Sequence, residues 1–270
     1  MPKAQRRYIF CRGTGLSKEH IWADWLKRYI PKNMTSYNSL SATVHETHAE
    51  FRHRRHGGDL RSRTLRVVCK SCNNGWMSQL QQRAKPYLLP LIAADVTAFN
   101  ATAQEILSAW VAMFVMVAEH FDRYKVVSSQ KELRFLWKDQ KAPSNWKIWI
   151  GDYEQKNWKG LLARFCVPIS SRKHRIKRMD NGLPRPNTQT ATFVVGRLYV
   201  HVASSATDIF EHWHLDRPDL LVQIWPVRRN IVAWPPTTMT DRDADGIAGA
   251  FHRFSDEVGQ RMVERSWAAR

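Results

Sequence analysis

The stretch VVCKSCNNGW, residues 67–76, constrains the fold of this chain more than any other. Its two cysteines, Cys69 and Cys72, stand at the spacing typical of a metal knuckle. The chain has two further cysteines, Cys11 and Cys166. So few cysteines in 270 residues favour a metal site or plain thiols over a disulfide framework. We therefore expect a strand that ends at this knuckle and is followed by a helix.

Positive charge is concentrated beside the knuckle. The chain has a formal net charge of +18 at pH 7 and a pI near 10.2. Residues 1–90 hold 17 Lys and Arg against 5 Asp and Glu, whereas residues 91–270 hold 25 against 19. Such a field attracts polyanions and speeds their encounter, so we expect a nucleic-acid partner, DNA first and RNA as an alternative. Charge that serves only solubility is the competing interpretation.

The same composition argues against membrane contact. The sequence has no run of 18 or more apolar residues, and no basic amphipathic helix stands out. Its first residues, MPKAQRRYIF, lack the apolar core and cleavage site of a secretory signal. We therefore expect a cytoplasmic protein.

Periodicity and turn residues predict the elements of the first third of the chain. They indicate a helix at residues 17–31, a hairpin of strands at 48–55 and 60–69, and a helix at 72–85. Pro31 and Pro86 would end the two helices, and Gly57-Gly58 would form the hairpin turn.

The rest of the chain mixes helical and strand patterns. Helices are expected at 102–121, 128–140 and 240–267, and strands at 146–153, 160–170, 191–204 and 220–227. The first of these helices is apolar nearly all round, so it should be buried in a core. Ser128 or Ser129 would cap the second helix and Thr240 the third. Cys166 falls in an apolar strand pattern, so we expect a core residue.

The predicted elements place the protein in the α+β class, with two domains. Residues 1–90 form a small, basic unit that carries the knuckle. Residues 91–270 are expected to form a larger domain of helices and antiparallel strands, for which no motif indicates a role.

Three side chains in the first third of the chain suit phosphodiester hydrolysis when taken together. This reaction needs a base that activates water and a divalent cation that neutralises charge on the phosphate. The imidazole of His20 suits the first task near neutral pH. The carboxylate of Glu19 and the amide oxygen of Asn73 are hard ligands of the kind that magnesium prefers.

These residues resemble the HNH endonucleases, the ββα-metal nucleases. The pattern is a Glu-His pair, a turn with glycines, and then an xLxxxCxxCN stretch that opens a helix, here TLRVVCKSCN. The resemblance covers about residues 8–85, roughly a third of the chain. It implies an N-terminal module in which a β-hairpin and a helix clamp one divalent cation.

The resemblance also implies a role for each residue. Glu19 and Asn73 would bind magnesium, manganese or another transition metal, and Asn74 would replace Asn73 if the register shifts by one. His20 would be the general base for hydrolysis of DNA. The family is common in phages, mobile elements and defence systems, so such a setting, with a protein partner or activator, belongs to the expectation.

The sequence departs from the family pattern in two places. Thr64 stands five residues before Cys69, where the family has an asparagine that orients the loop bearing the base. A hydroxyl at Thr64 can still bond a carbonyl, with less reach. The first knuckle, which would read CxxC, is YIFC here, with Tyr8 in place of one cysteine.

Three cysteines therefore remain for a structural zinc: Cys11, Cys69 and Cys72. Structural zinc sites are almost always four-coordinate. The fourth ligand could come from one of the histidines His45, His48, His53 and His56. The alternative is that no zinc is bound and the cysteines pack as small apolar side chains.

Two groups of cations suit contacts to a phosphate backbone. The first comprises Arg52, Arg54, Arg55, Arg61, Arg63 and Arg66. Alternation along a strand puts about half of them on each face, so only some can reach one duplex. The second group, Arg172, Lys173, Arg175, Lys177 and Arg178, is either a second backbone contact or a solvated loop.

The leading hypothesis is therefore a metal-dependent HNH-type endonuclease. The alternative is a nucleic-acid-binding protein that keeps the HNH scaffold and has lost turnover. Thr64 and the incomplete first knuckle favour this alternative.

Overall fold

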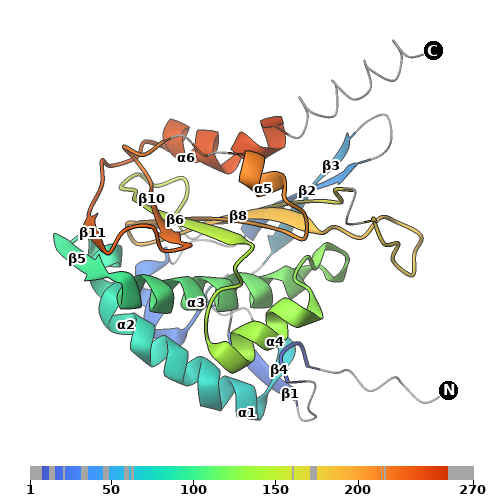
Figure 1. The fold of residues 1–270 in the computed structure, drawn as a ribbon, viewed down its shortest axis with the longest axis horizontal. Coiled ribbons are helices and arrows are strands. Elements are labelled where there is room, and N and C mark those ends of the chain that lie inside the picture. The colour runs from blue at the N-terminus through green and yellow to red at the C-terminus, as the bar shows by residue number, and fades with distance from the viewer. Residues whose placement is uncertain are drawn as a thin grey trace.

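The apolar helix expected in the middle of the chain is the central helix of the fold (Figure 1). This helix, α3 (Ala101–Ala118), begins at Asn100, whose side chain accepts a hydrogen bond from the backbone N–H of Ala103 at 3.0 Å. A 3-10 turn, η4 (Glu119–Phe121), follows it. Ala101–Phe121 is long and apolar enough to cross a membrane, but 78% of its apolar window is buried inside the protein. It is a core helix, as predicted.

The fold belongs to the α+β class, as expected from the sequence. The computed structural model describes residues 8–11, 16–20, 22–31, 36–44, 49–57, 61, 64–159, 161–170, 175–213, 215 and 217–254.

A five-stranded antiparallel sheet, in the order β10-β6-β9-β8-β7, lies against α3. Its strands are β6 (Trp146–Asp152), β7 (Leu162–Val167), β8 (Thr188–Val195), β9 (Leu198–Ser205) and β10 (Val222–Trp225). The run predicted at 191–204 forms two of these strands, because Gly196 reverses the chain with a φ of +58°. A Cβ atom at Gly196 would lie 2.6 Å from a side-chain carbon of Ile92, so only glycine fits this turn.

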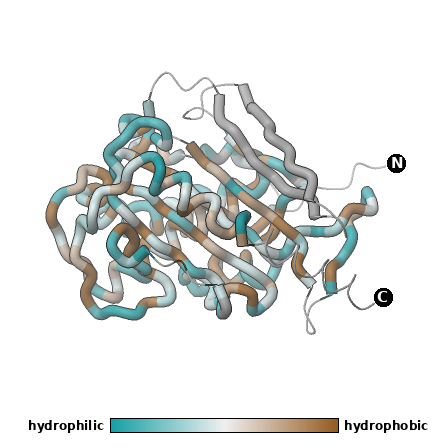
Figure 2. Tube along the Cα trace, turned by 90° about the horizontal axis from the view of Figure 1, so that it is seen from above, coloured by the Kyte–Doolittle hydropathy of each residue, from teal (hydrophilic) through white to brown (hydrophobic). Residues whose placement is uncertain are grey.

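Helices cover both faces of the sheet. Figure 1 shows α2 (Ser78–Ala93), α3 and α4 (Gln130–Asp139) below it, and α5 (Ile209–His212) and α6 (Asp241–Ala248) above it. A 3-10 turn, η5 (Arg123–Lys125), precedes α4, and a small sheet pairs β5 (Thr97–Asn100) with β11 (Ile231–Trp234). In Figure 2 the segments that cross the middle of the molecule are largely apolar, and hydrophilic residues predominate in several surrounding loops. Each face of the sheet thus has its own apolar layer.

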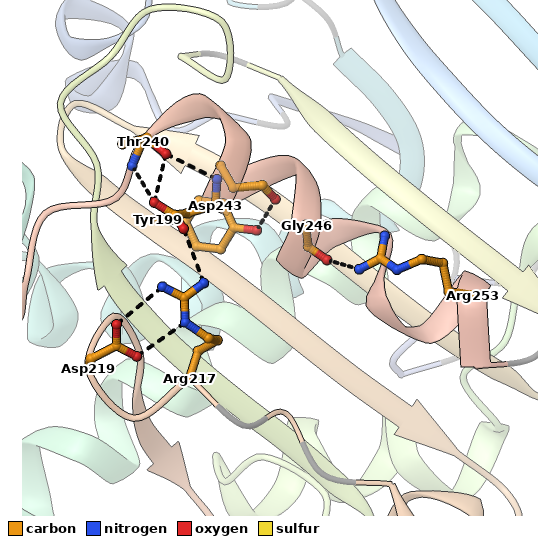
Figure 3. Close-up of polar contacts among 8 residues, drawn as sticks. Tyr199, Arg217, Asp219, Thr240, Asp243, Gly246 and Arg253 are labelled. Atoms are coloured by element: carbon orange, nitrogen blue, oxygen red, sulfur yellow. Dashed lines mark hydrogen bonds and ion pairs between the residues drawn. The ribbon is translucent and has the colours of Figure 1, made fainter.

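Polar contacts hold α6 in its place above the sheet (Figure 3). Thr240 and Asp243 form a reciprocal capping box at its first turn, as the sequence predicted for Thr240. Arg217 donates to Asp243 at 3.1 Å and also pairs with Asp219. The hydroxyl of Tyr199, on β9, donates to the backbone carbonyl of the helix at Ala244, at 3.0 Å. The predicted helix from residue 240 is therefore confirmed in its first half, and residues 255–267 lie outside the described part.

The segment predicted as a helix at 17–31 is instead a strand and a 3-10 helix. β1 (Leu16–His20) pairs antiparallel with β4 (Thr64–Cys69), and η1 (Asp24–Tyr29) follows. Trp22, Leu26 and Ile30 are buried, so the apolar repeat is real. The helix prediction was wrong because strand pairing with β4 overrides the local periodicity of residues 17–20.

The predicted hairpin of 48–55 with 60–69 is also wrong. β3 (Ala49–Gly57) pairs with β2 (Ser36–Val44), the strand before it, and β4 pairs with β1. The β2–β3 hairpin is thus an insertion between the two strands of the β1–β4 pair. β2 lies beside β7, the edge strand of the large sheet.

The helix after the knuckle is longer than predicted. α1 (Lys70–Cys72) passes through a π turn, η3 (Asn73–Met77), which is kinked at Gly75 (φ −94°, ψ −114°), into α2, which continues past Pro86 and Pro90. Buried Leu88, Leu91 and Ile92 anchor its second half, and this packing outweighs the cost of the prolines. The predicted domain boundary after residue 90 falls inside α2 and stays a prediction.

The buried aromatic residues show how the N-terminal elements join the rest. The centroid of the Trp22 ring lies 4.5 Å from that of Phe114 on α3 and 5.8 Å from that of Phe193 on β8. Phe114 and Phe193 lie 4.4 Å apart. One apolar cluster therefore runs across the predicted boundary.

Candidate metal and catalytic site

The three cysteines of the predicted zinc site lie together. Cys11 belongs to a turn at residues 8–11, Cys69 ends β4, and Cys72 ends α1. Their sulfur atoms all lie within 4.8 Å of one another, and those of Cys11 and Cys69 are 3.3 Å apart. Sulfurs bound to one tetrahedral zinc at about 2.3 Å lie about 3.8 Å apart. The sulfurs are therefore placed so that one metal ion could bind all three.

Backbone contacts explain this placement. The N–H of Ile9 donates to the carbonyl of Val67 at 3.1 Å, which holds the N-terminal turn against β4. The N–H of Cys72 donates to the Cys69 sulfur at 3.3 Å, so Cys69 caps the helix that begins after it. Phe10 packs edge-on against Trp76 with 4.9 Å between the ring centroids. The knuckle thus joins the turn, the strand and the helix.

The surroundings of the thiols separate their pKa values. Burial acts to raise the pKa of Cys69, but hydrogen bonds from Ser71 and from the Cys72 backbone outweigh it and lower the pKa to about 7. Burial and the neighbouring thiols raise the pKa of Cys72 to about 12. A coordinated metal ion would deprotonate both thiols, because a thiolate is the form that binds zinc.

The fourth zinc ligand is still a prediction. Tyr8, at the position of the missing cysteine, is buried. The side chains of His45, His48, His53 and His56 all lie outside the part of the chain that the structure describes.

Asn73 connects the helix to strand β1. Its amide Nδ2 donates a hydrogen bond to the hydroxyl of Ser17 at 3.0 Å. The amide oxygen Oδ1 is then the atom of Asn73 that could bind a cation. Asn74, the alternative ligand, is exposed.

Two backbone irregularities meet at this contact. The β1–β4 register shifts between Ser17, which pairs with Val68, and Glu19, which pairs with Leu65, so β4 carries an extra residue there. On the helix side, Asn73 opens the π turn. β-Bulges next to active sites often redirect side chains, and π turns often mark functional sites.

His20 ends β1, directly opposite Thr64 on β4. Its Nδ1 atom is buried and has no hydrogen-bond partner among the described residues. Beside His20 lies a cavity of about 20 Å³, which suffices for one water molecule. The other lining residues are Ala23, Met77, Gln81, Trp110, Met113, Phe114 and Val117. One side of the imidazole therefore faces a small, mostly apolar space against α3.

The remaining predicted residues are placed only in part. Glu19 lies in β1, but its side chain is outside the described part, so its distance from Asn73 is untested. Arg66 is exposed on β4 and Arg61 is partly exposed. Arg52, Arg54 and Arg55 lie on β3 with side chains outside the described part, and Arg63 lies outside it altogether. Cys166 is buried in β7, as predicted.

Sequence reasoning missed two residues of this region. Neither Ser17 nor Gln81 was predicted to belong to the site. Gln81 lies four residues after Met77, so these two side chains share one face of the helix. Helical phasing from Met77 would have placed Gln81 beside that buried residue. Ser17 could not be found, because its role depends on the pairing of β1 with a strand about fifty residues later in the sequence.

Comparison of the chain with protein-family models, with curated proteins and with solved structures found no match.

Proposed function

We propose that this protein is a metal-dependent endonuclease of the HNH type that hydrolyses phosphodiester bonds in DNA. The main support is the contact between Asn73 and Ser17, which joins a bulged strand pair to a π turn. His20, at the end of the same strand, and the cysteine cluster beside the helix add to it.

In the proposed mechanism, His20 takes a proton from a water molecule, and the resulting hydroxide attacks the scissile phosphate in line. The bond between phosphorus and the 3′ oxygen breaks as the new bond forms, and the 3′ oxygen leaves. Because Nδ1 is buried with no hydrogen-bond partner among the described residues, Nε2 would be the nitrogen that accepts the proton. Glu19 and Asn73, or Asn74 in the shifted register, would hold the cation. A bound magnesium or manganese ion would neutralise the charge that develops on the phosphate.

The first experiment tests His20 by nicking of supercoiled plasmid DNA with magnesium or manganese. His20→Ala should lower the rate by about 10²-fold or more, the usual contribution of a general base. Lys18→Ala, an exposed neighbour on β1, is the matched control and should nick like the parent. The assignment is wrong if His20→Ala cuts as fast as the parent.

The same assay distinguishes the two asparagines. Asn73→Ala should slow nicking, because it removes a proposed ligand of the cation. It should also lose the hydrogen bond to Ser17, which is worth about 1 kcal/mol of unfolding free energy. Asn74→Ala, at an exposed position, should change neither rate nor stability appreciably. The reverse order of effects on nicking would assign the ligand to Asn74.

A nucleic-acid-binding protein without turnover is the second candidate. Thr64 opposite His20, and the apolar wall beside the imidazole, favour it. This function predicts DNA binding that persists in EDTA, together with no cleavage in magnesium, manganese or other divalent ions.

A further inference from the structure

The connection between β7 and β8 contains a small ordered hairpin that the proposed mechanism does not use. We call residues 177–185 the basic hairpin; Figure 1 shows it projecting beyond β8 at the edge of the molecule. The N–H of Arg185 donates to the carbonyl of Lys177 at 2.7 Å, and that of Met179 to Leu183 at 2.9 Å. Gly182, with a φ of +78°, makes the turn. The segment is therefore a defined scaffold for its side chains.

The basic hairpin and its flank present four exposed cations and one exposed acidic residue, Asp180. The exposed cations are Arg175, Lys177, Arg178 and Arg185. Within the part of the chain that the structure describes, none of them forms an ion pair. By contrast, Arg197 and Arg217 pair with aspartates. The charge of the basic hairpin is thus left for an external anion.

Lys177 and Arg185 are direct cross-strand neighbours. The bridge between Arg178 and Pro184 and the bond from Arg185 to Lys177 fix this register. Side chains at such positions lie about 5 Å apart at Cβ, and like charges there destabilise a strand pair. An anion bound between the two cations would remove this repulsion. A loop that is only solvated has no need to place two cations side by side.

We propose that the basic hairpin is a second contact surface for the phosphate backbone of DNA, separate from the candidate catalytic site. This inference rests on the proposed function, because it takes DNA as the substrate. β2 lies beside β7, from which the connection to the hairpin leaves, and β3 beyond it carries Arg52, Arg54 and Arg55. The connection to the basic hairpin therefore leaves the sheet at the strand that lies beside the β2–β3 pair. Contacts of this kind position a duplex and read no sequence.

Binding of a 30-base-pair DNA duplex in EDTA, over a range of salt concentrations, tests the proposal. The double variant Lys177→Ala/Arg185→Ala removes two phosphate contacts. The slope of log K against log salt should therefore fall in magnitude by about 2, and affinity at 0.1 M salt by roughly fifty-fold. The matched control, Lys131→Ala/Lys138→Ala, removes two exposed cations from α4 and should keep the parent's slope.

An unchanged slope in the hairpin variant, or an equal loss in the control, overturns the proposal. Circular dichroism and the thermal midpoint confirm that each variant is folded, which we expect because both side chains are exposed. Binding in EDTA is independent of turnover, so the two hypotheses fail separately. If the parent's affinity falls steeply with salt but the parent never nicks DNA, the nuclease hypothesis is wrong and the DNA contact of the basic hairpin still stands. If the parent nicks DNA but the hairpin variant keeps the parent's salt slope, the nuclease hypothesis stands and the hairpin contact is wrong.

Discussion

Asn73 shows how single residues connect the elements of the candidate site. Its side chain bonds Ser17 on β1, while its backbone opens the π turn. A substitution of Asn73 would therefore affect the contact with the strand, the start of the π turn and the binding of the proposed cation. The neighbouring Asn74, of identical chemistry, points to solvent and offers a direct internal control.

The cysteine cluster predicts that the protein binds one zinc ion. Protein purified from zinc-containing medium should hold about one zinc per chain by elemental analysis, and EDTA should lower its thermal midpoint. Cys72→Ser should bring the zinc content well below one, because three thiolates define the site. Cys166→Ser, a buried cysteine in β7, should keep its zinc. A parent without zinc would mean that the cysteines only pack as small apolar side chains.

Sequence reasoning anticipated the cysteines better than their polar neighbours. The CxxC spacing fixes local geometry, so the convergence of Cys69 and Cys72 needs no knowledge of the fold. The role of Ser17 and the cavity beside His20 both depend on segments that are distant in sequence. No local pattern records such contacts.

Among the elements, the caps were predictable and the pairings were not. Ser129 caps α4 with a reciprocal bond to Glu132, and Thr240 caps α6, as their side-chain chemistry indicates. β1 was mistaken for a helix because its partner β4 is absent from any local window. The uninterrupted passage of α2 through Pro86 was missed for the same reason, since tertiary packing decides it.

A buried histidine on strand β9 should make the stability of the protein depend on pH. Burial lowers the pKa of His201 from an ordinary 6.5 to about 3, and its Nδ1 bonds the Thr192 hydroxyl at 2.8 Å. Between these pH values the unfolded chain binds a proton that the folded protein excludes, so stability falls as pH drops below about 6.5.

His201→Phe removes this titration. Its stability relative to the parent should rise by about 1.4 kcal/mol for each pH unit between pH 6 and pH 4, measured by urea unfolding. Thr192→Val removes the hydrogen bond but leaves the imidazole, so its difference from the parent should stay nearly constant. Parallel pH profiles for the parent and His201→Phe would show that His201 is not the group responsible.

At the scale of the whole molecule, an aromatic cluster joins the two predicted domains. Phe114 on α3 touches Trp22 from the N-terminal elements and Phe193 from the sheet. The sequence predicted the α+β class and the small basic unit from composition and periodicity. It did not predict that this unit shares an apolar cluster with the larger one, because periodicity shows which residues are buried and not what buries them.

Phe114→Ala therefore tests the division after residue 90. The substitution should lower the free energy of unfolding by about 3–5 kcal/mol. Far-ultraviolet circular dichroism and tryptophan fluorescence should still report a single shared transition. Phe135→Ala, at a position 39% exposed, should cost under about 1 kcal/mol. Two separate transitions would instead support independently folding domains.

The insertion of the β2–β3 hairpin between β1 and β4 has a consequence for synthesis of the chain. Cys11 and Cys69 are 58 residues apart, and translation adds about 5–20 residues per second. About 3–12 s therefore pass between the appearance of the N-terminal turn and that of the knuckle that secures it. During translation, β1 is made first, and its partner β4 is made only after the inserted β2–β3 hairpin is complete. We expect chaperones and proteases to meet the N-terminal segment in this interval, before any metal can close the knuckle.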